Sequence, residues 1–394
     1  MRDLWQIFIK FFTSLRLTVV LLALGIVLVF VATLAQTDMG VWGVQQGYFH
    51  TFFAFPKWHG TPVFILPGGY LVGGLLLINL IAAHLYRFRL TWKKIGIQLA
   101  HAGVILLLVG ELLSGLWQEE YQMSIDTGQT KNFAESYRKH ELAIMDTIDP
   151  KFDAVVAIPE QLLAHLGKID TQDKLPFRVV VRNYWPNAEM HGPMMAPGQI
   201  PGAALANRDI GATLSLTPAA PTTQDNTRNL PAASVELVSP DGGTLGTWLV
   251  SPLLNTPQTF DYAGKTWSLS LRVARAYYDF SLTLRKFSHD LYPGTEIPKN
   301  YSSFVQLKSD DGQADHDVLI YMNSPLRYQG LTFYQASFAN NDQTTILQVV
   351  RNPSWTLPYV SCLLVAGGLL VQFGMSLLGF VGRRKSAVSP PVQT

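Results

Sequence analysis

The chain has 394 residues, and its 30 basic and 28 acidic side chains leave a formal net charge of only +2. Such a balance argues against nucleic acid as a partner, because no dense basic face is available to neutralise phosphates. With one cysteine, Cys362, the chain has neither a disulfide nor a CxxC redox pair.

The N-terminal residues 1–16 precede the first long apolar segment and alternate aromatic and basic side chains. This pattern is typical of a short amphipathic helix lying on the inner leaflet of a membrane. We therefore expect residues 1–16 to form a cytoplasmic interfacial segment.

Four long apolar segments follow, at 17–35, 64–86, 95–117 and 357–381. Each has about the 20 residues that an α-helix needs to cross the hydrocarbon core. Lipid offers no hydrogen bonds to the backbone, so such segments must be helical. The sequence therefore predicts an integral membrane protein with four transmembrane helices.

Basic residues flank these segments on one side: Lys10, Arg16, Arg87, Arg89, Lys93, Lys94, Arg383, Arg384 and Lys385. The positive-inside rule places them, both termini and the tail 382–394 in the cytoplasm. Residues 118–356 then lie outside the inner membrane of a bacterium. A cleaved signal peptide is the alternative interpretation of 17–35, but its apolar core is longer than a typical signal core.

In residues 118–356 the long apolar runs give way to alternation of β-branched and aromatic residues with polar ones. The expected strands are 177–184, 267–273, 280–287, 303–307 and 344–350. Turn signals at 241–243 and 310–312 favour a large, mostly antiparallel β domain, either a sandwich or an open barrel. We expect a short surface helix at 159–166 and a long loop or lid at 191–231.

Three ionisable residues fall inside the apolar segments, namely His84, His101 and Glu111. Ionisable groups in a bilayer are costly and are therefore functional candidates. His101 lies among small residues that leave room for a flat ligand, so we interpret it as a ligand of haem iron. His84 is a second candidate, with a simple interhelical hydrogen bond as its alternative. Glu111 fits a snorkelling or interhelical role better than proton transfer.

The other histidines lack metal-ligand spacing. His50 and His59 lie in an aromatic-rich loop that is typical of a membrane interface, and their role stays open. We expect the remaining ones to be surface or turn residues: His140, His165, His191, His289 and His316. No nucleophile elbow, phosphate-binding loop or paired carboxylates are recognisable, so no catalytic residue is assigned.

Three motifs together carry a family resemblance. They are residues 14–22 leading into ATLAQ at 32–36 and GYFH at 47–50, the stretch LAHAGVILLLVG at 99–110, and MNSPLRYQGLTFYQAS at 322–337. With the arrangement of helices and exported domain, they identify the chain as similar to the ResB (CcsB) family of cytochrome c biogenesis proteins.

The resemblance implies a subunit of the System II cytochrome c maturation complex. Such a subunit binds haem b in the membrane and works with a ResC (CcsA) partner to move haem outward for attachment to apocytochrome c. In this family a histidine of the third membrane helix is an axial haem ligand, and His101 matches that position. His84 has no counterpart that we can assign.

In the resembled family the tryptophan-rich motif that presents haem belongs to the partner, and the nine tryptophans here are dispersed, so the chain alone is not expected to complete the attachment of haem. Having no thiol pair, it is also not expected to reduce the apocytochrome cysteines. Whether it is itself an enzyme stays open. One alternative is a membrane-anchored assembly subunit that binds partner proteins without touching haem. A small-molecule transporter is a further alternative, disfavoured because no inverted repeat is evident.

Overall fold

The computed structural model describes residues 2–58, 61–86, 91–147, 154–172, 174–192, 198–225, 227–254, 256–295 and 298–388. His59, Arg87, Arg89 and the tail beyond 388 lie outside these residues, so the interpretations placed on them stay predictions. The chain forms two compact units, Met1–Glu119 with Asn352–Thr394, and Glu120–Arg351. We describe each unit by itself.

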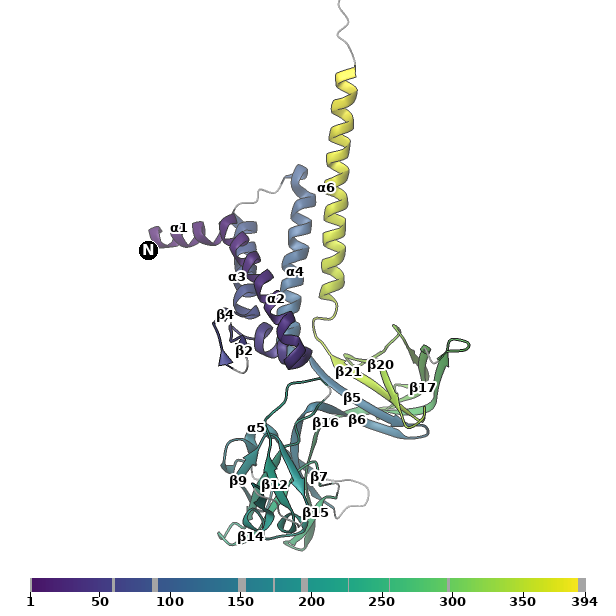
Figure 1. The fold of residues 1–394 in the computed structure, drawn as a ribbon. Coiled ribbons are helices and arrows are strands. Elements are labelled where there is room, and N and C mark those ends of the chain that lie inside the picture. The colour runs from purple at the N-terminus through teal and green to yellow at the C-terminus, as the bar shows by residue number, and fades with distance from the viewer. Residues whose placement is uncertain are drawn as a thin grey trace, which may run out of the picture. The chain divides into compact units, whose positions relative to one another are not determined.

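The first unit is helical (Figure 1). Its helices are α1 (Arg2–Phe12), α2 (Leu15–Val44), η1 (Gln45–Phe49), α3 (Gly69–Tyr86), η2 (Trp92–Lys94), α4 (Ile95–Trp117) and α6 (Leu357–Val388). Two short antiparallel strand pairs lie between η1 and α3: β1 (Phe53–Ala54) pairs with β4 (Leu66–Pro67), and between them in the chain β2 (Lys57–Trp58) pairs with β3 (Thr61–Pro62). Among the described residues, four helices are long and apolar enough to cross a membrane.

The helix bounds differ from the sequence prediction at three places, one of which is the end of α6, which continues beyond 381 to Val388. The first helix does not end at 35 but continues to Val44, with a break at Gly40, whose φ is 73°. Residues 64–68 are not helical; they lead through β4 into α3, which begins at Gly69. Pro67 has no amide hydrogen to donate and favours an extended residue before it, which explains the later start. Helix α4 has the predicted bounds.

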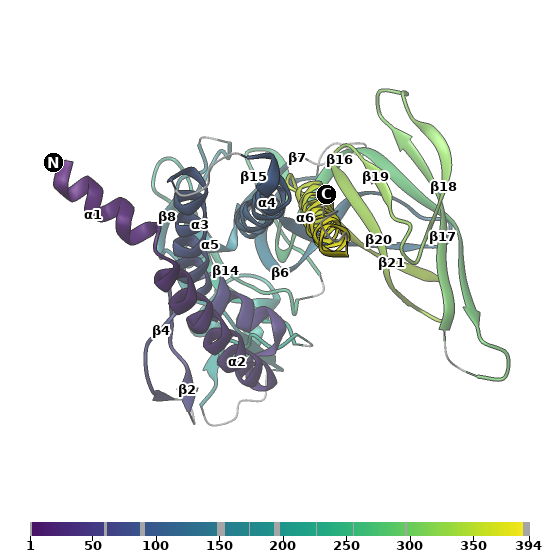
Figure 2. The ribbon, with the colours of Figure 1, turned by 90° about the horizontal axis from the view of Figure 1, so that it is seen from above.

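Helices α4 and α6 lie side by side, as both views of the ribbon show (Figures 1 and 2). Their backbones approach closely because glycines occupy the contact. A Cβ on Gly96 would lie 2.6 Å from the carbonyl oxygen of Gly368, and a Cβ on Gly368 would lie 2.5 Å from the amide nitrogen of Ala100. Small residues that allow such approach are a common device of helix packing in membranes.

The second unit is built of antiparallel strands. These are β5 (Glu119–Asp126), β6 (Thr130–Asp146), β7 (Ala154–Pro159), β8 (Gly167–Ile169), β9 (Arg178–Trp185), β10 (Ala188–His191), β11 (Ile200–Pro201), β12 (Ser215–Pro218), β13 (Ala232–Val238), β14 (Thr244–Val250), β15 (Gln258–Tyr262), β16 (Lys265–Leu291), β17 (Pro298–Ser309), β18 (Asp315–Tyr321), β19 (Leu326–Tyr328), β20 (Leu331–Ala339) and β21 (Thr344–Arg351). The large antiparallel β domain expected from the sequence is therefore present.

Two hydrophobic cores lie along the same two long strands, β6 and β16. The first core is formed where one half of these strands, with β7 and β15, packs on the four-stranded sheet β14-β13-β9-β8. The second core is enclosed by the other half with β5 and β17–β21, in the order β18-β17-β16-β6-β5-β21-β20-β19. β18 also contacts β20, so this sheet curls toward closure (Figure 2).

Residues 267–273 and 280–287 are strand, as predicted, but they are not two separate strands, because both belong to the single 27-residue strand β16. Its pairing register with β6 shifts twice between Val273 and Leu282. The residues whose side chains point into the core change there from odd-numbered ones, such as Leu271, to even-numbered ones, such as Phe280. A β-bulge produces such a change, and in the sequence it resembles an interruption.

The predicted loop at 191–231 is also only partly correct. It contains the 3₁₀ turns η3 (Gly202–Ala204) and η4 (Ile210–Thr213), and β12, which pairs with β10 and β11 in a small sheet. These strands are two to four residues long, too short to give a periodic signal. The expected short helix is present as α5 (Glu160–Leu163).

Candidate functional site

His101 lies in the second turn of α4 and is half-buried. Its ring Nδ1 is 2.8 Å from the carbonyl oxygen of Ile97, one turn earlier in the helix. A carbonyl oxygen only accepts, so Nδ1 donates the hydrogen and the lone pair of the neutral ring lies on Nε2. The nitrogen oriented in this way is the one that histidine commonly offers to a metal.

The direction of His101 follows from the glycines that face α6. Gly96, Gly103 and Gly110 recur every seven residues, and a Cβ on each would lie within 3.1 Å of atoms of α6. At 100° per residue, His101 points about 160° away from Gly103 around the helix axis. The imidazole therefore lies on the side of α4 opposite α6.

His84 lies in the last turn of α3, which contacts α4. The two candidate histidines are thus on neighbouring helices, as the sequence predicts. His84 is half-buried, like His101. Glu111 is exposed on α4, which is compatible with the snorkelling role expected for it.

His50 is a packed residue near the opposite end of α4. Its ring stacks on Tyr70, with centroids 5.6 Å apart and an interplanar angle of 8°. The hydroxyl of Tyr70 in turn donates to the carbonyl oxygen of Gly115 at 3.5 Å. His50 therefore links the segment after α2 to α3 and α4.

His140 is buried, with 3% of its surface exposed, so the prediction of a surface or turn residue was wrong. It lies on β6 and is hydrogen-bonded to Glu160, which begins α5, and Glu160 also accepts the hydroxyl of Tyr184 on β9. Burial and the contact with Glu160 raise the pKa of Tyr184. Twenty residues separate His140 from Glu160, and no spacing rule relates a strand residue to the start of a distant short helix.

His289 was also expected at the surface but packs into the second core. Its Nδ1 is 3.2 Å from a carboxylate oxygen of Asp342, and its ring packs against those of Tyr301 and Phe338, which also contact each other. His165 and His316 are exposed, as predicted. Within the described part of the chain, no group of three or more His, Cys, Asp or Glu is placed to hold a metal ion.

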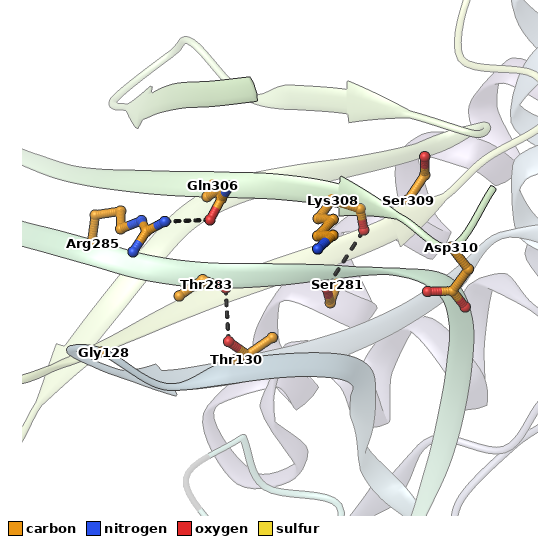
Figure 3. Close-up of a pocket in the computed structure, with 9 residues that line it drawn as sticks. All are labelled: Gly128, Thr130, Ser281, Thr283, Arg285, Gln306, Lys308, Ser309 and Asp310. Carbon is orange, nitrogen blue, oxygen red and sulfur yellow. Dashed lines mark hydrogen bonds between the residues drawn. The ribbon is translucent and has the colours of Figure 1, made fainter. Parts of the chain in front are cut away.

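The second unit carries a polar cavity of about 740 Å³ on the outer face of β6, β16 and β17 (Figure 3). Its lining residues are Gly128, Thr130, Ser281, Thr283, Arg285, Gln306, Lys308, Ser309 and Asp310. Thr130 and Thr283 bridge neighbouring strands through their hydroxyls, 2.8 Å apart. No local sequence pattern indicates this cavity, because its lining residues come from three strands and two turns.

Parts of the chain are similar to known proteins. A sequence model described as the ResB-like family matches residues 263–346, which run from the end of β15 through β16 to the start of β21. Over these residues the chain is similar to the ResB-like family. The resemblance predicted from the sequence motifs is thereby confirmed.

Curated proteins that are similar to parts of the chain carry informative names. The "Protein NrfI" of Wolinella succinogenes is 33% identical over 110 residues, which are 26% of the chain and 12% of that protein. The "Cytochrome c biogenesis protein CcsB" of Synechococcus elongatus is 30% identical over 97 residues, 25% of the chain and 21% of the relative. The "Cytochrome c biogenesis protein CcsB" of Trichormus variabilis is 26% identical over 116 residues, which are 29% of the chain and 24% of the relative. The matched stretches span less than a quarter of these relatives.

Proposed function

We propose that this ResB-like protein takes part in cytochrome c maturation as a haem-handling membrane subunit. In this proposal His101 binds haem iron in the membrane, and haem moves outward to be attached to apocytochrome c together with a ResC (CcsA) type partner. The site is on the cytoplasmic half of α4, in the inner membrane of a bacterium, with both termini in the cytoplasm and Glu120–Arg351 on the outer side.

The observation that carries the proposal is the hydrogen bond from His101 Nδ1 to the carbonyl oxygen of Ile97. It fixes the tautomer that presents Nε2 as an iron ligand. The face of α4 opposite α6 is the one from which a partner subunit can approach His101 without separating α4 from α6. The names of the relatives place two of them in cytochrome c biogenesis, which supports the same role.

Haem would gain from its protein environment an axial imidazole and a site of low polarity. Both tune the potential of the iron, and attachment of haem to apocytochrome c requires the reduced metal. His84, on the neighbouring helix α3, is the second residue that we propose near haem. The alternative function is that of a structural subunit that binds partner proteins and never contacts haem.

The test is the visible absorption spectrum of the full chain, purified in mild detergent together with its partner. We expect a haem Soret band that is lost or weakened in His101→Ala and restored by added imidazole. The matched control is His50→Ala, because His50 stacks on Tyr70 near the other end of α4. His84→Ala measures the contribution of the second candidate.

Equal haem content in wild type, His101→Ala and His50→Ala would overturn the ligand role of His101. A wild-type preparation that stays haem-free even with added haem would favour the structural subunit. In that case the interaction with the partner protein should survive all of these substitutions.

A further inference from the structure

A β-bulge in β16 places two basic side chains next to each other on the outer face of the second unit. The register with β17 shifts between Leu284 and Lys286, so Arg285 is the extra residue. Leu284 and Phe287 are buried, while Arg285 and Lys286 between them are both exposed. Bulges redirect side chains in this way and are frequent beside binding sites.

Lys308 adds a third positive charge on the same face, since it pairs with Ser281 across the strands and shares the polar cavity with Arg285 (Figure 3). Three other arginines on strands of this unit, Arg182, Arg272 and Arg275, form ion pairs with glutamates. Among the described residues, no carboxylate lies within ion-pair distance of Arg285, Lys286 or Lys308. These cations are available to an anionic ligand.

The rest of the cavity wall also favours an anion. Thr130 and Thr283 share one hydrogen bond, so one of their two hydroxyls can still donate to a ligand, and the Arg285 guanidinium donates to Gln306, which holds it over the cavity. Asp310 lies at the end of the cavity remote from Arg285, as Figure 3 shows. Asp315, on β18, accepts the amide of Gln306 at 2.6 Å.

An exposed apolar ladder continues this face beyond the bulge. Lys286 pairs with Phe304 on β17, and Phe304 pairs with Leu319 on β18. Phe304 is 39% exposed and Leu319 50%, and the neighbouring Tyr321 is 44% exposed. Unpaired cations thus border an apolar surface, an arrangement that suits a ligand with carboxylates at one edge of a flat apolar body.

We propose that this outer face of β16, β17 and β18 binds a porphyrin through its two propionate carboxylates. Arg285, Lys286 and Lys308 hold the carboxylates by charge-assisted hydrogen bonds, and the macrocycle lies over Phe304 and Leu319. In this site the protein contacts the carboxylates and the apolar macrocycle of the porphyrin and not its iron. The inference rests on the proposed function in that haem is the cargo, and it assigns haem a second contact site in the exported domain.

The experiment titrates the full chain in detergent with metal-free protoporphyrin IX and follows its fluorescence at one fixed detergent concentration. This probe has no iron, so His101 ligation does not contribute to its binding. We expect the double variant Arg285→Gln, Lys308→Gln to bind about tenfold more weakly than wild type, since charge-assisted hydrogen bonds are lost. The dimethyl ester of the probe should bind wild type and double variant equally.

Two controls make the result specific. Lys168→Gln removes an exposed cation on β8, in the other sheet, and should leave the affinity unchanged. The charge-conserving double variant Arg285→Lys, Lys308→Arg should retain most of the binding. It serves as the test if the double glutamine variant folds poorly. The proposal would be overturned if wild type and the double glutamine variant bound protoporphyrin IX equally well. It would also be overturned if wild type bound the dimethyl ester as tightly as the free acid.

The two haem sites are tested independently. Loss of the Soret band in His101→Ala does not predict any change in the binding of the metal-free porphyrin, which has no iron for His101 to ligate. Conversely, the Arg285→Gln, Lys308→Gln variant should keep the His101-dependent Soret band. Failure of one assay is therefore distinguishable from failure of the other.

Discussion

Glu160 accepts two hydrogen bonds from His140, one from its backbone amide at 3.0 Å and one from ring Nδ1 at 3.1 Å. The other carboxylate oxygen accepts the hydroxyl of Tyr184. This one carboxylate thereby joins β6, α5 and β9. Buried polar groups stabilise a fold when all of them are satisfied in this way.

The Glu160 contacts predict acid sensitivity. Burial raises the pKa of Glu160, but the hydrogen bonds from His140 and Tyr184 and the attraction to His140 outweigh burial, so the pKa lies below its usual 4.5. A carboxyl group with a depressed folded-state pKa stabilises the fold above its unfolded pKa, and this contribution is lost as the pH falls through the folded value. We expect the free energy of unfolding of the wild type to fall below pH 4.5 more steeply than that of Glu160→Gln.

Chemical denaturation of the full chain across this pH range measures the difference. Glu189→Gln is the matched control, because the Glu189 side chain is 69% exposed, and it should keep the wild-type slope. The explanation fails if Glu160→Gln keeps that slope as well.

A second prediction concerns the ion pair between Arg272 and Glu141, whose side chains are 15% and 9% exposed. Arg272→Ala would leave Glu141 buried without its cation, so we expect a destabilisation of about 3 kcal/mol. In the comparison pair, Arg182 is 58% exposed beside Glu236, and Arg182→Ala should cost less than about 1 kcal/mol. Equal losses in denaturant midpoints would contradict the role of burial.

A third prediction concerns the contact of α4 with α6, where two adjacent glycines of α6 differ in their surroundings. A Cβ on Gly368 would clash with the backbone of α4, whereas a Cβ on Gly367 would meet nothing within 4 Å. We expect Gly368→Ala to lower the thermal stability of the detergent-solubilised protein and Gly367→Ala to leave it unchanged or slightly raise it. If the two variants melt together, the close approach of the helices is not essential.

Asn79 supplies the fourth prediction. Its side chain is buried in α3, donates to the carbonyl oxygens of Phe12 and Ser14, and accepts the hydroxyl of Thr18. Asn79→Leu removes these hydrogen bonds, so the free energy of local unfolding at the junction of α1 and α2 should fall by about 1–2 kcal/mol. Hydrogen exchange of residues 2–18 should quicken while that of the β strands does not. Thr18→Ser, which keeps the hydroxyl, is the control and should exchange like the wild type.

The spans, the antiparallel strands and both turn signals were predictable because each rests on residues that are close in the sequence. Helix α4 matches its apolar run, and the turns at 241–243 and 310–312 join β13 to β14 and β17 to β18. The continuity of β16 was not predictable, because a bulge reverses the inward parity. The burial of His140 depends on α5 and β9, whose position no local pattern determines.

The candidate site was predictable only in part. The sequence identified His101 and His84 as ionisable residues within apolar segments, but the hydrogen bond to Ile97 and the face opposite α6 needed the structure. The polar cavity beside Arg285 was missed altogether. The exposed cations lie on two strands, β16 and β17, and a bulge in β16 redirects two of them, so they come together only after the sheet has formed.

The continuity of β16 also decides how the second unit can be divided. Because β6 and β16 contribute to both cores, either core expressed alone would leave the ends of two long strands with unpaired amides and carbonyls. Such edges template pairing with other chains. Fragments cut between the cores should therefore aggregate, and proteolysis at any one exposed turn should leave the nicked halves associated.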